Sequence, residues 1–163
     1  MEAIDFGELY AMYSADVFRF AMYLTASHAE AEDITSETFA RAIAGADTIR
    51  VGTVKAYLLT IARNLHVDSK RRQARDAELL HDPRDPGPNP EAVSAIRGEL
   101  RAVTSALQQL PEVDRAAVLM RAFHNLGYEE IAAALGLTPA AVRVKVHRAR
   151  LRLAVASGGD ENA

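Results

Sequence analysis

The stretch YEEIAAALGLTPAAVRVKVHRAR, Tyr128–Arg150, contains the clearest structural motif of the C-terminal part of this chain. A helix-turn-helix needs a small residue where its two helices touch, a residue that tolerates positive φ in the turn, and an aliphatic anchor on the second helix. Ala132, Gly136 and Val142 supply these three residues, at separations of four and then six positions. The stretch therefore predicts a helix-turn-helix.

The second helix of this motif has a recognisable start and two different faces. Thr138 can cap its N-terminus, and Pro139 suits its first turn because the N–H that proline lacks has no partner there. Between Leu137 and Leu153 the sequence has five cations and no anion. An apolar stripe with steps of four, three and four residues is predicted to be buried: Val142, Val146, Ala149 and Leu153.

The opposite face of this helix is predicted to contact DNA. Small and apolar residues there are flanked by cations on both sides, the pattern that suits a helix in the major groove. The alternative is an ordinary amphipathic helix with a solvated basic face. We favour DNA binding because the helix-turn-helix spacing, the Thr-Pro start and the absence of anions coincide.

So basic a helix contrasts with the formal net charge of the whole chain, which is −3. Charge is distributed in blocks: residues 1–40 carry a net −7, residues 41–75 a net +6, residues 76–100 a net −4 and residues 101–163 a net +2. Blocks of one sign create local potentials that select partners. A single block can also be a solvated helix face, so its meaning depends on the motifs that it contains.

The N-terminal part is predicted to contain three helices and no strand. Ser27 and Glu30 form a capping box, which starts a helix that runs to about Ala44. The third helix continues into RNLHVDSKRRQAR. Two segments have apolar residues at helical steps of three and four: Phe6, Leu9, Tyr13, Val17, Phe20 and Leu24 in the first, and Val54, Leu58, Ile61 and Leu65 in the second.

A proline-rich segment divides the chain. Four of the six prolines lie between His81 and Glu91, where they exclude a continuous helix. Helices from about Glu91 to Gln108 and from Glu112 to about Phe123 are predicted to precede the helix-turn-helix. The predicted fold is all-α: helical domains at residues 1–78 and 93–156, an acidic proline-rich linker at 79–92 and a disordered tail at 157–163.

Composition excludes several classes of protein. The chain has no cysteine, its five histidines show no paired metal spacing, and no residue lies in a nucleophile motif or phosphate loop. No apolar run exceeds five residues, and the acidic N-terminus lacks the basic flank of a signal peptide. We therefore expect a cytoplasmic protein that is not an enzyme, uses no metal or cofactor and is not inserted in a membrane.

A second basic cluster lies at the end of the third predicted helix. It contains one anion, Asp68, and five cations: Arg63, Lys70, Arg71, Arg72 and Arg75. Two basic helices in separate domains of a jointed chain predict a bipartite contact with an extended polyanion, for which duplex DNA is the obvious candidate.

Three segments, in this order, resemble the extracytoplasmic-function (ECF) sigma factors of bacterial RNA polymerase. They are AEAEDITSETFARAI, VKAYLLTIARNLHVDSKRR and ALQQLPEVDRAAVLMRAFHNLGYEEIAAALGLTPAAVRVKVHRARLRL, and the resemblance extends from about Phe6 to Leu153. It implies a promoter-specificity subunit that binds core RNA polymerase, including its β′ clamp helices and β subunit. It also implies recognition of the −35 and −10 promoter elements, strand opening, and an inhibitory anti-sigma factor as partner.

The resemblance assigns roles to individual residues. Asp33, Ser36 and Glu37 match positions that dock on the β′ clamp helices, although related sequences often have glutamine at Ser36. Asn64 matches an asparagine near a flipped base of the −10 element. Four cations would hold the DNA backbone beside it: Arg63, Lys70, Arg71 and Arg72. The positions that contact the −35 element correspond to Arg143, Val144, Lys145, His147 and Arg148.

Other positions also depart from the family pattern or vary within the family. Val144 stands where a serine is common, and His147 occupies a position that varies with promoter choice. Tyr57 stands where a tryptophan is common, and because it lies on the apolar stripe we predict that it is a core residue rather than a stacking platform.

One alternative function remains open, a stand-alone helix-turn-helix transcription regulator with a helical N-terminal interaction domain. The C-terminal motif alone does not separate the two possibilities. The first domain favours the sigma factor, because a phosphoacceptor domain would need alternating strands and helices with clustered aspartates. A pure adaptor that never touches DNA would leave both cation clusters unexplained.

Overall fold

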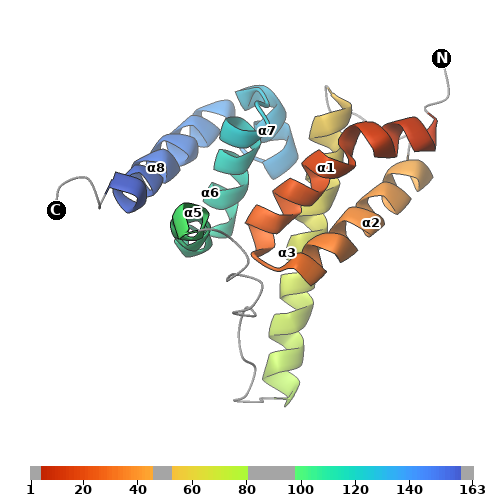
Figure 1. Cartoon of the computed structure of the whole chain (residues 1–163), viewed down its shortest axis with the longest axis horizontal. Helices are drawn as coiled ribbons and strands as arrows, with labels where there is room; N and C mark the ends of the chain where they lie inside the picture. Colours follow the sequence, from red (N-terminus) through yellow and green to blue (C-terminus); the bar gives the residue numbers. More distant parts are fainter. Residues whose placement is uncertain (1–4, 46–52, 81–97, 159–163) are drawn as a thin grey trace.

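The computed structural model describes residues 5–45, 53–80 and 98–158, and all regular secondary structure in these ranges is helical (Figure 1). The predicted all-α fold is therefore confirmed. The elements are α1 (Phe6–Thr25), α2 (His28–Ala44), α3 (Val54–Leu80), α5 (Gly98–Gln109), α6 (Glu112–Val118), the π-helical segment η2 (Leu119–Phe123), α7 (Tyr128–Leu135) and α8 (Pro139–Gly158).

A tight turn joins α1 to α2. Ala26 ends α1 in the left-handed region with φ 56°, which is uncommon for a residue with a side chain. The Thr25 hydroxyl supports this turn, because it donates to the Ala21 carbonyl at 2.8 Å and accepts from the Ser27 N–H at 3.1 Å. The Ser27 side chain then accepts from the Glu30 N–H at 3.2 Å, which confirms the predicted start of α2. The predicted capping box is only half formed, because the Ser27 N–H donates to Thr25 and not to the Glu30 carboxylate.

The helix-turn-helix has the features that the sequence predicted. Gly136 adopts φ 67° at the end of α7, and the Thr138 hydroxyl accepts from the Ala141 N–H at 3.1 Å at the start of α8. Ala132 is 5% exposed and Val142 is fully buried. These residues therefore form the helix contact, the turn and the anchor of the motif.

The helix predicted from Glu112 to about Phe123 changes from α-helical to π-helical geometry at Leu119. After α6, the chain widens into η2, where the His124 N–H donates to the Leu119 carbonyl at 3.2 Å, five residues back. Asn125 then turns the chain with φ 58°. A π-turn of this kind shifts the register of the residues that follow it. The π-helical segment therefore sets the positions of Phe123 and His124.

The two halves of the chain share one hydrophobic core. In Figure 1, α1, α2 and α3 lie together, α5 to α8 lie beside them, and α1 contacts α5 and η2 while α3 contacts α7. One continuous apolar cluster includes buried residues from both halves, among them Phe20, Phe39, Leu58, Leu107, Met120 and Ile131. The sequence had left the relative position of the two halves undetermined.

The C-terminal part of α3 projects away from this core. Figure 1 shows it extending beyond the other helices, and the side chains of residues 71–78 are all exposed. The helix predicted from about Glu91 is described from Gly98 onward, as α5. The predicted linker and tail each begin two residues too early, because α3 continues to Leu80 and α8 to Gly158. The remaining residues of both segments lie outside the described residues.

Candidate nucleic-acid and protein interfaces

The faces of α8 are sorted as the sequence predicted, except that Leu153, the last residue of the predicted buried stripe, is only partly buried. Val142, Val146 and Ala149 are each at most 1% exposed, and they pack against the core. Val144 is 60% exposed, and His147 is also exposed, on the opposite side of the helix. The outward face of α8 therefore combines an apolar patch with flanking cations.

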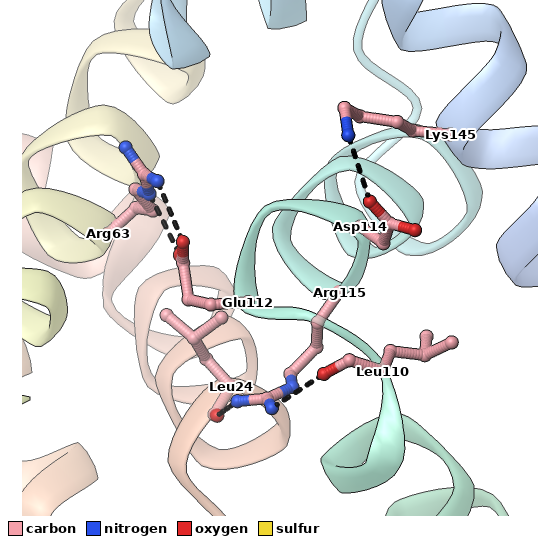
Figure 2. Close-up of polar contacts among 7 residues, drawn as sticks. All are labelled: Leu24, Arg63, Leu110, Glu112, Asp114, Arg115 and Lys145. Atoms are coloured by element: carbon pink, nitrogen blue, oxygen red, sulfur yellow. Dashed lines mark hydrogen bonds and ion pairs between the residues drawn. The ribbon is translucent and has the colours of Figure 1, made fainter.

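Two of the cations on α8 are held by a carboxylate on α6. The Lys145 Nζ lies 3.3 Å from Asp114 Oδ1 and the Arg148 Nε lies 3.7 Å from Asp114 Oδ2. Figure 2 shows Lys145 reaching from α8 to Asp114. Asp114 is only 3% exposed. Sequence reasoning missed this residue, because no helical period connects α6 with a helix about 30 residues later.

A third cation of α8 lies over an aromatic ring. The Arg143 guanidinium is 5.2 Å from the centroid of Tyr128, and the Arg121 guanidinium is 4.6 Å from the same centroid. Arg121 also donates to the Leu126 carbonyl at 3.0 Å. Cation–π contacts of this geometry limit the positions that an arginine side chain samples. Tyr128 therefore orients Arg143 at the edge of the predicted DNA-contacting face.

The residues predicted to contact the −10 element fall into two groups on α3. Asn64, Lys70, Arg71 and Arg72 are exposed. Arg63 differs, because its side chain is 15% exposed and its Nε and Nη2 donate to the two Glu112 carboxylate oxygens at 2.8 and 2.7 Å (Figure 2). Hydrogen bonding to Glu112 raises the pKa of Arg63. In this arrangement Arg63 is bound to α6 and is not free to contact DNA.

Arg115 connects the two halves through the backbone. Its guanidinium donates to the carbonyls of Leu107, Gln108 and Leu110 at 2.8, 3.2 and 3.1 Å, within the C-terminal half. It also donates to the Leu24 carbonyl at 2.9 Å, in the last turn of α1 (Figure 2). The last carbonyls of a helix lack intrahelical partners, so Arg115 caps α1 from the other half of the chain.

Aromatic pairs and two buried histidines complete the contact between the halves. Phe20 packs edge-on against His124 at 5.7 Å between ring centroids, and Tyr23 stacks with Phe123 at 5.4 Å. His124 is 4% exposed, and its Nδ1 has no hydrogen-bond partner in the described ranges. His66, on α3, is 2% exposed. Burial lowers the pKa of each histidine to about 4, so both are neutral near neutral pH.

The residues predicted to bind the polymerase lie on the outer surface of α2. Asp33, Ser36 and Glu37 are all exposed, and Glu37 pairs with Arg41 at 3.1 Å. Hollows flank this ridge on both sides. One, of about 170 Å³, lies between α2 and α3 and includes Asp33 and Glu37, and the other, of about 500 Å³, lies between α1 and α2 and includes Ser36.

Tyr57 is partly buried and packs against the core, which favours the prediction that it is not a stacking platform. Its ring packs against the hydrophobic cluster, and its hydroxyl donates to the Gly45 carbonyl at 3.2 Å. In the described parts of the chain, no group of three or more acidic or histidine side chains is arranged to hold a metal ion. None of the helices in those parts combines the length and apolar character that crossing a membrane requires.

Comparison with known proteins identifies the class to which these helices belong. A family model for Sigma-70 region 2 matches residues 9–76, and a model for Sigma-70, region 4, matches residues 100–153. The N-terminal helices thus match Sigma-70 region 2, and α5 to α8, which include the helix-turn-helix, match Sigma-70 region 4.

Curated relatives narrow the class to one family. ECF RNA polymerase sigma factor SigM of Bacillus subtilis is 30% identical over 148 residues, which is 90% of this chain and 91% of that protein. SigE of Mycolicibacterium smegmatis and BldN of Streptomyces coelicolor are 36% and 34% identical over 90% and 94% of this chain. The chain spans only 59% and 60% of the lengths of SigE and BldN. The chain belongs to the ECF RNA polymerase sigma factors.

Solved structures share this fold. The sigma factor RpoE from Bartonella quintana, in complex with the anti-sigma factor NepR, matches with a TM-score of 0.79 and 26% identity over 96% of this chain and 98% of that one. CnrH, in complex with the cytosolic domain of CnrY, matches with a TM-score of 0.67 and 24% identity over 95% of this chain and 88% of its own. The second match supports the fold alone.

Proposed function

We propose that this chain is a promoter-specificity subunit of RNA polymerase that recognises −35 and −10 elements and promotes strand opening. The observation that carries the proposal is that the three predicted contact surfaces lie on exposed faces of three different helices, α2, α3 and α8. In this proposal the chain acts in the cytoplasm and supplies recognition, while the polymerase supplies the chemistry. Residues 1–80 and 93–158 act as its two binding domains, joined by the linker 81–92.

The proposed polymerase contact is the ridge of α2. Asp33, Ser36 and Glu37 project from it between two hollows. An acidic ridge favours a basic partner surface, because complementary charge speeds association and fixes orientation. Family membership makes the β′ clamp helices the natural partner.

The proposed DNA contacts divide the work between two helices. The outward face of α8 enters the major groove of the −35 element, where cations reach bases and phosphates. On α3, exposed Asn64 holds an unstacked base of the −10 element, because opened strands are trapped by hydrogen bonds to the base edge. Lys70, Arg71 and Arg72 project with the free end of α3, where they can follow the DNA backbone.

The packed arrangement of the two halves does not fit a promoter-bound state. The −35 and −10 elements are about 25 base pairs apart, which is roughly 85 Å of duplex at about 3.4 Å per base pair. A compact chain of this length has a radius of gyration of about 15 Å and therefore a diameter of only about 40 Å. The two halves must separate to reach both elements, and separation releases Arg63 from Glu112.

An inhibitory partner would stabilise the packed arrangement. The similarity to RpoE covers 96% of this chain, and that sigma factor is solved with the anti-sigma factor NepR. The packed halves of this chain are thus similar to those of a sigma factor held by an inhibitor. We propose that this chain also has an anti-sigma factor, which keeps the halves together until it is released.

Run-off transcription tests the proposal directly. Core RNA polymerase is incubated with a promoter library, with and without the protein, and the transcripts are sequenced. Specific initiation only in the presence of the protein is the expected result. DNA binding upstream without initiation would instead favour a stand-alone regulator and would overturn the proposal.

Two variants separate the proposed roles of α3 and α8. Arg148→Ala is expected to weaken binding to duplex that contains the −35 element. Asn64→Ala is expected to leave duplex binding unchanged and to reduce strand opening, measured by permanganate reactivity of thymines near the start site. Equal losses in both assays for both variants would contradict this division.

A further inference from the structure

Asp114 is a nearly buried acid beneath a basic, DNA-reading helix. Its carboxylate lies on α6, is 3% exposed, and faces two cations on α8. A buried carboxylate is costly unless it is paired, so its position beside Lys145 and Arg148 needs an explanation. A second feature is that each carboxylate oxygen faces a different cation: Oδ1 faces Lys145 and Oδ2 faces Arg148.

The geometry leaves the two Nη groups of Arg148 available. Its Nε is the atom that faces Asp114, at 3.7 Å, and its side chain is 49% exposed. At 3.7 Å this contact is an ion pair and not a hydrogen bond. Because the five N–H groups of an arginine lie in one rigid plane, attraction at Nε favours one orientation of the whole guanidinium. Neither Nη group has a partner in the described ranges. Arg148 can therefore present both Nη groups to a ligand while Asp114 restrains the plane.

Lys145 has a different part in this cluster. Its Nζ donates to Asp114 Oδ1 at 3.3 Å and its side chain is 26% exposed, so it is turned toward α6 more than toward solvent. Two cations share one carboxylate, so the cluster keeps a net positive charge. Asp114 thus orients Arg148 without making this part of α8 repel DNA.

We propose that Asp114 is a positioning residue that holds Arg148 so that its two Nη groups meet the O6 and N7 acceptors of a guanine in the −35 element, with Lys145 balancing the buried carboxylate. Guanine is the ligand that a planar, two-pronged donor fits in the major groove. The inference rests on the proposed function of α8 in reading DNA. It adds the base that is read and the residue on α6 that makes the reading selective.

Arg150 provides a matched control on the same helix. It is exposed and has no carboxylate partner in the described ranges. An unrestrained arginine gains most of its binding from phosphates, which carry no sequence information. Its replacement should therefore weaken binding to all duplexes by a similar factor.

The experiment measures recognition of a single guanine by the full chain. A randomised duplex library is first selected for binding, which gives the preferred element, and each guanine of that element is then replaced by 7-deazaguanine, which lacks N7. Dissociation constants are measured for the wild type, Asp114→Asn, Arg148→Ala, the double variant and Arg150→Ala. Urea unfolding of each variant reports whether it is folded.

One guanine is expected to respond to the positioning of Arg148. Replacing it by 7-deazaguanine should weaken wild-type binding by about five- to tenfold. Asp114→Asn should weaken binding to the normal duplex by a similar factor, should lose the response to 7-deazaguanine, and should add no further loss in the Arg148→Ala background. Arg150→Ala should retain the response.

Other outcomes would overturn the proposal. Asp114 would have only a structural role if Asp114→Asn weakened binding equally on both duplexes and in both backgrounds. Tighter binding by Asp114→Asn would mean that the carboxylate withholds the cations from DNA. If Asp114→Asn does not fold, Arg148→Lys tests the same point: it keeps the charge but loses the fork, and unchanged discrimination would refute the inference.

The same data distinguish this inference from the proposed function. Failure of the library to yield any preferred duplex would count against DNA reading by α8 as a whole. A preferred duplex whose guanines are all insensitive to Asp114→Asn would leave DNA reading intact and reject the role of Asp114.

Discussion

The stability of the packed chain should depend on two buried histidines. Burial lowers the pKa of His66 and of His124 to about 4, from an ordinary value of 6.5. The folded chain therefore holds both side chains neutral at a pH where the unfolded chain protonates them. Since the unfolded state binds more protons, stability decreases as the pH falls below 6.5 and levels off below about 4.

The size of this effect follows from the two pKa values. Moving from about pH 7.5 to about pH 5.5 should lower the free energy of unfolding by about 1.4 kcal/mol per histidine, or about 3 kcal/mol for both. Carboxylates with ordinary pKa values remain almost fully ionised over this interval. A change of this size is a large part of the total stability of about 5 to 15 kcal/mol that is typical of a small protein.

Urea unfolding followed by circular dichroism measures this change at the two pH values. His66→Gln and His124→Gln should each reduce the pH-dependent difference by about half, and the double variant should nearly abolish it. His147→Gln is the matched control, because the His147 side chain is exposed in the folded chain. Equal stability of the wild type at both pH values, or a difference that persists in the double variant, would refute the reasoning.

Further predictions concern the backbone contacts of the fold. Arg115→Met should lower the free energy of unfolding by about 2 to 4 kcal/mol, because it removes the donor to the Gln108 and Leu110 carbonyls and one of two donors to the Leu24 and Leu107 carbonyls. Exposed Arg150→Met should change it by less than about 0.5 kcal/mol. Gly136→Ala should cost about 1 to 2 kcal/mol through its positive φ alone, since a Cβ there meets no atom within 4 Å. Gly127→Ala, at the N-cap of α7 with φ −71° and equally open surroundings, should cost less than Gly136→Ala in the same unfolding assay, because no positive φ is involved.

Local sequence determined the helices and their ends. Ser27 caps α2, Gly136 ends α7 and Thr138 caps α8 as expected, because each of these features depends on hydrogen bonds and φ angles within four or five residues. The outward face of α8 was also predictable, because the helical period of 3.6 residues places buried Val142 and exposed Val144 on opposite faces. The exposure of most of the predicted DNA-contacting and polymerase-contacting residues followed from the same period.

Tertiary structure decided which of the predicted contact residues are engaged. Arg63 pairs with Glu112, which lies 49 residues away in the sequence. Asp114 pairs with Lys145 and Arg148, which lie 31 or more residues later, on α8. No periodicity connects residues on different helices, so these pairs depend on how the helices pack.

Residue patterns along the chain were enough to predict an all-helical protein with a helix-turn-helix and the motifs of its family. Only the tertiary structure placed the two halves on one core, where Arg115 reaches the Leu24 carbonyl 91 residues away and both His66 and His124 are buried. The physical reason is that helix formation uses neighbouring residues, whereas burial and pairing between helices depend on the packing of surfaces that are distant in the chain.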